Sequence, residues 1–265
     1  MVTIAVTNQK GGVGKTTITF NLAQILAIRK YVRVLAIDND PQGNLTSSFI
    51  DPKASTTGST QDAYEGNKII PSPITKNLDL LGSNINLAKV SEQDFQVIFR
   101  LKESIEKLQR KITDKPYDYI LIDCLPSFGH LHLAALTAAD FILVPVKPAP
   151  YALAGLKDLF DTVARVKKFM NSSLRVLGIV INQVDGRRLV LEREMEAALR
   201  ETYGSLVFRQ RISKRCKLEE SPAFKKSIID YHPADPGGRE FSAVANEIQK
   251  RLRSKENSPF RGDKR

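Results

Sequence analysis

The stretch "NQKGGVGKTT", residues 8–17, decides the fold of this 265-residue chain. It follows the β-branched, apolar run "VTIAVT", and from Lys15 onward apolar residues recur at the spacing of a helix. Glycines between a strand and a helix let backbone N–H groups converge on phosphate oxygens, and the helix N-terminus adds a favourable dipole. The stretch therefore predicts a phosphate-binding loop.

Each residue of this loop has an expected role. The Lys15 ammonium should contact the β- and γ-phosphates of a nucleotide, and the Thr16 hydroxyl should bind Mg²⁺. The residues expected to surround the phosphates are Gly11, Gly12, Val13, Gly14, Lys15, Thr16 and Thr17. The usual pattern G-x-x-x-x-G-K-[ST] begins with glycine, whereas this chain has Lys10 at that place. The loop therefore carries a second lysine.

Beyond the loop, strands and helices alternate along the sequence. Apolar runs predict further strands at 31–38, 77–83, 117–127, 140–146 and 174–182. Helical spacing predicts helices near 62–65, 91–111, 130–138, 152–169, 189–203 and 241–252, with the rest of 51–77 as surface connection. The alternation predicts an α/β fold, a mostly parallel, twisted β-sheet with helices on both faces. We expect a single domain at 1–253 and a polar, basic tail at 254–265.

With "KGGVGKT" at residues 10–16, the chain resembles the ParA/MinD family of ATPases, whose phosphate loop is a deviant Walker A form. The resemblance implies a P-loop NTPase fold and Mg²⁺-dependent hydrolysis of ATP to ADP and phosphate. It also implies that Lys10 reaches across an ATP-sandwiched homodimer to the phosphates bound by the partner. The alternative is that Lys10 is a solvated loop cation.

Two acidic segments complete the site in the manner of this family. The stretch "DNDPQGN", 38–44, matches the family's first switch, which implies that Asp40 orients the attacking water and that Asp38 lies near the Mg²⁺. The alternative for both is a satisfied carboxylate at a strand end. The stretch "YILIDCLPS", 119–127, matches the second switch, which implies that Asp123 binds Mg²⁺ through water. Leu125 replaces the first of two prolines common in the family, but the acid is kept.

The resemblance to the ParA/Soj branch of small partition ATPases covers almost the whole chain. It includes "NLDLLGSNINLA" at 77–88, "ALTAADFILVPV" at 135–146, "YALAGL" at 151–156 and "KLEESPAFKKSIIDYHP" at 217–233. Asn182 follows the strand "GIVIN", at a position where the wider class often hydrogen-bonds adenine. Its amide offers both a donor and an acceptor, but it could equally cap a turn.

The excess of basic residues favours a polyanionic partner. The net charge is +11 and the sequence pI is about 9.6, values that favour nucleic acid or acidic membrane surfaces. By resemblance to the branch, the residues expected to contact double-stranded DNA are Arg187, Arg188, Arg209, Lys214, Arg215 and Lys217. Such contacts release phosphate counterions without reading bases, so binding would be nonspecific and salt-sensitive. The alternative is a solvated basic rim.

Together these features predict an ATP-dependent partition ATPase for a chromosome or plasmid. ATP would drive formation of a dimer that binds DNA, and hydrolysis stimulated by a ParB-like, centromere-binding partner would release it. One alternative is a ParA-like positioning ATPase for a cargo other than DNA. The other is a MinD-like division regulator at the membrane.

Several features argue against membrane and metal-cluster proteins. No apolar run approaches the ~20 residues that cross a bilayer, and the start lacks the pattern of a secretory signal. We therefore expect a cytoplasmic, nucleoid-associated protein without membrane contact. Cys124 and Cys216 match no cluster-ligand motif and are expected to be buried as small apolar groups. His130 and His132 are expected at the surface or as capping groups.

Overall fold

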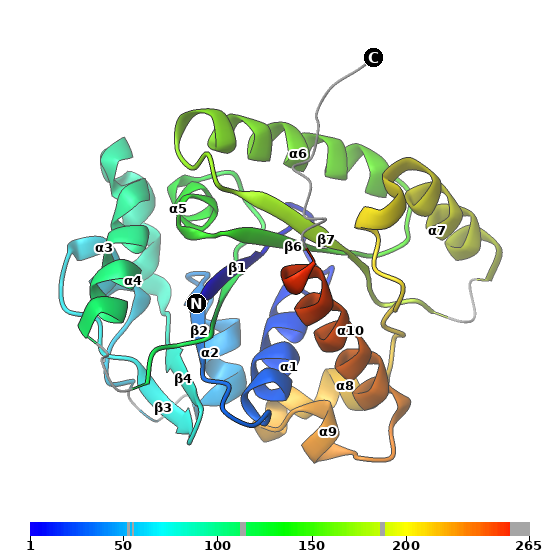
Figure 1. The fold of residues 1–265 in the computed structure, drawn as a ribbon, viewed down its shortest axis with the longest axis horizontal. Coiled ribbons are helices and arrows are strands. Elements are labelled where there is room, and N and C mark those ends of the chain that lie inside the picture. The colour runs from blue at the N-terminus through cyan, green and yellow to red at the C-terminus, as the bar shows by residue number, and fades with distance from the viewer. Residues whose placement is uncertain (52–53, 55, 112–114, 186–188, 255–265) are drawn as a thin grey trace.

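A seven-stranded, mostly parallel β-sheet forms the centre of the computed structural model, which describes residues 1–51, 54, 56–111, 115–185 and 189–254. The strands are β1 (Val2–Val6), β2 (Val34–Asn39), β3 (Ser72–Thr75), β4 (Leu78–Leu81), β5 (Tyr119–Cys124), β6 (Phe141–Val146) and β7 (Arg175–Ile181). Their spatial order is β3-β4-β2-β5-β1-β6-β7, and in this part of the chain only the pair β3 and β4 is antiparallel. Figure 1 shows this sheet between layers of helices.

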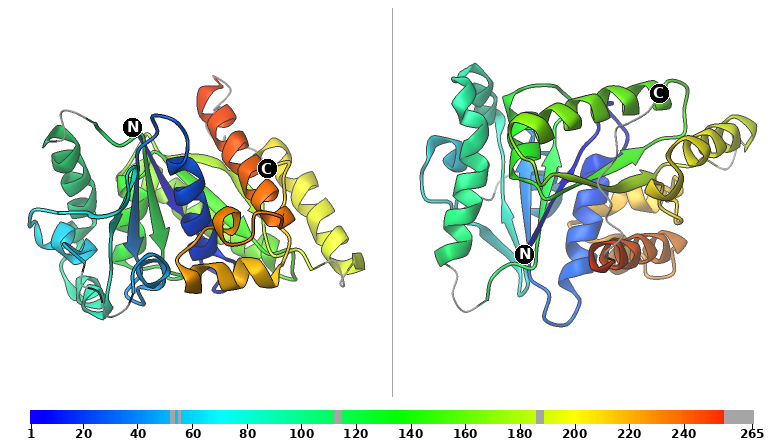
Figure 2. Two further views of the ribbon diagram at one scale, coloured as in Figure 1. Left: turned by 90° about the horizontal axis from the view of Figure 1, so that it is seen from below. Right: turned by 45° about the horizontal axis from the view of Figure 1, so that its top comes forward.

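Helices cover both faces of the sheet (Figure 2). The α-helices are α1 (Lys15–Ala27), α2 (Asn44–Phe49), α3 (Thr60–Glu65), α4 (Arg100–Lys111), α5 (His130–Ala138), α6 (Ala152–Phe169), α7 (Leu189–Tyr203), α8 (Cys216–Glu220), α9 (Ile228–Tyr231) and α10 (Pro236–Arg253). One core joins the sheet to α3, α4, α5, α6 and α7, and the other joins it to α1, α2 and α10. This confirms the predicted α/β class.

Burial of the central strands on both faces places the polar residues of the site at one edge of the sheet. Every residue of β2 and of β6 is buried, as expected for parallel strands covered on both sides. In the register of the sheet, Asp123 of β5 lies beside Val6 of β1 and beside Asp38 of β2. The phosphate-loop candidate follows β1, so the loop and both acids meet at the carboxyl ends of neighbouring strands.

The structure corrects three of the predicted elements. The helix expected at 91–111 is α-helical only from Arg100, since two 3-10 helices, Ile85–Glu92 and Phe95–Phe99, precede it and extended backbone at Gln93 ends the first of them. The connection at 51–77 contains β3, an edge strand that tolerates Pro73. The last helix begins at Pro236 rather than at 241.

The early start of α10 has a local cause. The Asp235 side chain accepts a hydrogen bond from the Gly237 backbone N–H at 2.7 Å, and Pro236 occupies the first turn. Both are features of a helix N-terminus. The helix packs on the domain through buried Phe241. No described helix combines the length and the hydropathy that crossing a bilayer requires.

Two predictions about single residues are wrong. His132 is 1% exposed rather than at the surface, because its position on α5 faces the sheet, where its Nε2 lies 2.9 Å from Thr7 Oγ1. Cys216 is exposed at the start of α8 rather than buried. Cys124 is buried as expected, since it belongs to the central strand β5.

Candidate functional site

The loop between β1 and α1 has the backbone that its glycines predict. Gly12 and Gly14 have φ values of +71° and +88°, in the left-handed region that favours glycine. The Asn8 side chain fixes the start of the loop, since its Oδ1 accepts a hydrogen bond from the Lys10 backbone N–H at 2.9 Å. Its Nδ2 donates to the Pro145 carbonyl at 2.8 Å, which ties the loop to the end of β6. Sequence reasoning did not identify this role of Asn8.

The two lysines of the loop lie in different environments. Lys15 is 7% exposed, and its Nζ donates to the Lys10 carbonyl at 3.2 Å. Burial lowers the pKa of Lys15, against the opposing effect of nearby Asp123. The Lys10 side chain is exposed, and no ion pair recorded among the described residues involves it. One lysine therefore faces the inside of the loop, and the other faces solvent.

Asp123 lies under the loop at the carboxyl end of β5. It is 1% exposed, and its Oδ2 accepts a hydrogen bond from Thr16 Oγ1 at 2.7 Å. Thr19, one turn further along α1, donates to Asp123 Oδ1 at 3.4 Å. Burial, and then the charge of Asp38, raise the pKa of Asp123 to about 8. Removal from water thus makes the negative charge of this carboxyl costly unless a cation offsets it.

The first acidic segment is ordered by its own hydrogen bonds. Asp38 Oδ2 accepts from the Thr46 backbone N–H at 2.8 Å and from Thr46 Oγ1 at 2.7 Å, which ties β2 to α2. Burial raises the pKa of Asp38 to about 6. Asp40 is 9% exposed, and its Oδ1 accepts from the Gln42 backbone N–H at 2.9 Å. Asp38 thus makes the hydrogen bonds expected of a satisfied carboxylate at a strand end, which was the alternative interpretation. It also lies beside Asp123.

The donor set fits Mg²⁺. Asp38, Asp123 and Thr16 supply carboxylate and hydroxyl oxygens, the hard ligands that Mg²⁺ prefers. The raised pKa values of the two acids indicate that ionising them is costly in this buried position, and a bound cation would offset that cost. The described residues contain no group of three His, Cys, Asp or Glu side chains that could hold a metal. Magnesium in this site would therefore need oxygens from phosphate or water, as is usual for nucleotide-bound Mg²⁺.

Asn182 braces the phosphate-loop candidate. It follows β7, is 2% exposed, and its Nδ2 donates to the Val13 carbonyl at 2.8 Å. A Cβ on Gly14 would stand 2.2 Å from the same Nδ2. This hydrogen bond joins residues 169 positions apart in sequence. Sequence reasoning placed Asn182 at this edge of the sheet but did not identify its contact with the loop.

The residues predicted to contact DNA differ in their surroundings. Arg187 and Arg188 lie outside the described residues. Arg209 and Lys214 are exposed. Lys217 is half-buried and forms an ion pair with Glu220 at 2.9 Å.

Arg215 is held by carboxylates at the start of the last helix. Its guanidinium lies 2.9 Å from Glu240 and 3.6 Å from Asp235, and 26% of its side chain is exposed. Glu240 also accepts hydrogen bonds from the backbone N–H and the hydroxyl of Ser213. Arg215 thus helps fix the basic segment on α10, a role that its sequence context did not reveal.

Comparison with known proteins gives the family. Residues 1–176 match the family model described as an AAA domain. The chain is 36% identical over 254 residues to the sporulation initiation inhibitor protein Soj of Bacillus subtilis (strain 168), covering 92% of this chain and 97% of that protein. It is also 36% identical over 258 residues to the chromosome-partitioning ATPase Soj of Thermus thermophilus, covering 94% and 96% of the two chains.

A solved structure agrees with this relationship. The crystal structure from Mycobacterium smegmatis described as cobyrinic acid a,c-diamide synthase, with a bound ATP analogue and magnesium, matches with a TM-score of 0.78 and 26% identity. The match covers 98% of each chain. These relatives, together with the double-lysine loop and the acids at the strand ends, show that the chain belongs to the ParA/Soj family of partition ATPases.

Proposed function

We propose that this protein is a Mg²⁺-dependent ATPase that partitions replicated DNA by switching between a nucleotide-bound dimer and a monomer. The observation that carries the proposal is the arrangement of Lys15, Thr16 and Asp123. A buried lysine, a hydroxyl and a buried acid converge beneath a glycine loop at the ends of β1 and β5. The similar structure with a bound ATP analogue and magnesium supports a nucleotide as the ligand.

In this proposal the loop residues bind and position the triphosphate. The backbone N–H groups of residues 11–17 surround the phosphates, and Lys15 exchanges its bond to the Lys10 carbonyl for phosphate oxygens. Thr16, Asp38 and Asp123 would hold Mg²⁺, which would neutralise charge on the phosphates. Asp40 orients the attacking water, and its charge is near enough to Asp123 to contribute to the raised pKa of that acid. Asn182 holds the loop in shape and contributes to the adenine site.

The position of Lys10 supports dimer formation. Its exposed side chain lies on the same loop as Lys15, so a second subunit facing this loop would receive the cation at its own nucleotide. A site completed by the neighbouring subunit makes assembly depend on ATP, and hydrolysis reverses it. We propose that the dimer binds double-stranded DNA nonspecifically and that a ParB-like partner stimulates release.

The DNA-binding surface of the proposal centres on the exposed cations Arg209 and Lys214, with Arg187 and Arg188 as further candidates. Lys217 and Arg215 act with them, although their ion pairs with carboxylates reduce the charge that they offer. Contacts of this kind release counterions from DNA and carry no base recognition. The excess of cations over acids in the chain agrees with such a role.

Retention of the protein on DNA tests the function. Purified protein is passed over immobilised double-stranded DNA of random sequence with ATP, with ADP or without nucleotide, at about 50 mM and about 200 mM salt. We expect retention only with ATP and a marked loss at the higher salt. Lys15→Ala should abolish ATP-dependent retention, and Lys214→Glu should weaken it without preventing dimer formation. Equal retention in all nucleotide states would contradict the proposal.

A further inference from the structure

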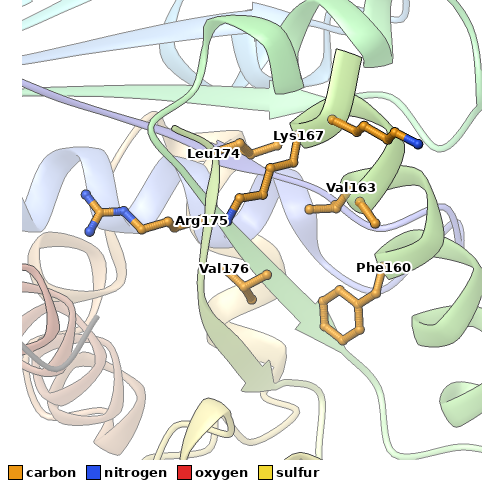
Figure 3. A pocket seen from close by; sticks show the side chains of 8 residues that line it. Phe160, Val163, Lys167, Leu174, Arg175 and Val176 are labelled. Atoms are coloured by element: carbon orange, nitrogen blue, oxygen red, sulfur yellow. The ribbon is translucent and has the colours of Figure 1, made fainter. Parts of the chain in front are cut away.

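A pocket lies between α6 and the start of β7, at the end of the sheet away from the nucleotide site (Figure 3). Its volume is about 250 Å³. It is lined by residues of α6 and by 174–176, whereas Asn182 follows the other end of β7. A strand of seven residues spans roughly 20 Å, so the pocket is separate from the phosphate loop.

The interior of the pocket is apolar. Leu174 is fully buried, and Phe160 and Val163 are 5% and 6% exposed. Figure 3 shows Phe160 and Val163 of α6 opposite Val176 of β7, with the open space between helix and strand. Water is bound weakly in an apolar cavity of this kind, because it finds few hydrogen-bond partners there. The volume of the pocket exceeds that of the roughly 150 Å³ apolar cavity that admits benzene, so one large apolar side chain can enter it.

The surface around the pocket is basic. The range 160–176, which contains the pocket-lining residues, has four cations, Arg165, Lys167, Lys168 and Arg175, and one acid, Asp161, and the two lysines line the pocket from α6. Figure 3 shows Lys167 extending from α6 toward the strand, and Arg175 projecting to the other side of β7, where its guanidinium lies 4.7 Å from the Phe141 ring centroid. Among the described residues, no ion pair is recorded for these four cations.

Two features separate this surface from an ordinary helix end. Lysines in the last turn of a helix offset the helix dipole, and Lys167 and Lys168 do so here. That role needs no cavity, yet Lys167 and Lys168 also line one. Phe169, next in sequence, is 69% exposed, which extends the apolar surface beside the cations. A cavity, an exposed aromatic ring and a group of cations together form a surface suited to an amphipathic acidic ligand.

We propose that this pocket docks an acidic segment of a partner protein, which inserts one large apolar side chain between α6 and β7. Carboxylates beside that side chain would lie near Lys167 and Lys168, and charge complementarity would select acidic over basic partners. Because the pocket lies at the opposite end of the strands from the phosphate loop, a docked partner leaves nucleotide binding unobstructed. The inference does not depend on the proposed function.

Binding of designed peptides tests this proposal. The probes are short fluorescein-labelled peptides with one Leu or Phe flanked by Asp and Glu, titrated with the full chain and followed by fluorescence anisotropy. One control peptide has Lys in place of the acids, and another has Ser in place of the apolar residue. We expect saturable binding of the acidic apolar peptides and binding at least about tenfold weaker for both controls, because each control removes one half of the complementarity.

Variants of the protein locate the binding site. Ala164→Trp fills the mouth of the pocket from an exposed helix position, and Lys167→Glu reverses the nearest charge. Both should weaken peptide binding about tenfold, Ala164→Trp because it prevents burial of the apolar side chain and Lys167→Glu because it sets a carboxylate beside the acidic peptide. Lys157→Glu, an exposed position of the same helix that does not line the pocket, is the matched control and should bind as the wild type does. Unchanged melting temperatures check that the variants fold.

Three results would overturn the proposal. The first is the absence of saturable binding to any acidic apolar peptide. The second is equal binding by wild type and Ala164→Trp. The third is displacement of the peptide by phosphatidylglycerol vesicles or by DNA, with the same sensitivity to Lys167→Glu, because the surface would then serve a lipid or a nucleic acid.

Discussion

The replacement Gly14→Ala should disable the phosphate loop through two separable effects. The φ of +88° at Gly14 costs an alanine about 1–2 kcal/mol whatever its neighbours are. The new Cβ would also stand 2.2 Å from Asn182 Nδ2, so the amide must move and release the Val13 carbonyl. Loss of that hydrogen bond adds about 1 kcal/mol. We therefore expect a total destabilisation of about 2–3 kcal/mol and a large loss of ATP affinity.

A double-mutant cycle with Asn182→Ala separates the two effects. Asn182→Ala alone loses the bond to Val13, and its cost is about 1 kcal/mol or more because the carbonyl is left buried. In the double variant the clash is absent, and only the backbone strain at residue 14 adds to the cost of Asn182→Ala. The sum of the two single costs should therefore exceed the cost of the double variant by about 1 kcal/mol.

Urea unfolding and titration with a fluorescent ATP analogue measure the cycle. Gly155→Ala is the matched control, since Gly155 lies within α6 and, apart from neighbouring residues and backbone of the same helix, no atom lies within 4 Å of the place that a Cβ would take there. This control should leave ATP affinity unchanged and stabilise the helix by up to about 1 kcal/mol. If the two single costs sum to the cost of the double variant within about 0.3 kcal/mol, Asn182 does not brace the loop and the reasoning fails.

Three further predictions concern single side chains. Burial lowers the pKa of His132 from 6.5 to about 4, so its stability contribution is complete above about pH 6.5 and is lost as the pH falls toward 4. As the pH falls from about 7.5 to about 5.5, the free energy of unfolding measured in urea should fall by about 1.3 kcal/mol more for wild type than for His132→Gln. Equal decreases would refute this. Asp40→Ala should keep ATP-dependent dimers but stop phosphate release, whereas normal turnover would exclude Asp40 from the reaction. Arg215→Ala should lower stability by about 1–3 kcal/mol in thermal or urea unfolding, because two carboxylates lose their partner; the exposed Lys214→Ala should not.

The sequence predicts the order of the elements well, because periodicity and glycine placement are local properties. The bounds of α6 and α7 are as predicted. The start of α10 was missed because Gly237 and Gly238 interrupt the apolar spacing by which a helix is identified. The helix begins there because the Asp235 side chain caps its N-terminus. The strand β3 was missed because its pairing with β4, rather than its own short sequence, makes it a strand.

The site was predictable in its residue types but not in its hydrogen-bond partners. Motif spacing identified Lys15 and Thr16, the family resemblance identified Asp123, and the structure brings the three together. The bond from Asn182 to Val13 and the burial of His132 depend on how distant elements pack. Local patterns carry no information on such contacts, since they arise from the order of strands in the sheet.

The central claim is that two subunits enclose ATP and that each lends Lys10 to the other. Sedimentation velocity of wild type and Lys10→Ala with Mg²⁺ and a non-hydrolysable ATP analogue tests it most directly. The account predicts a dimer for wild type and a monomer for Lys10→Ala, although the variant still binds the analogue through Lys15. A wild type that stays monomeric when saturated with the analogue, or a variant that dimerises as wild type does, would contradict it.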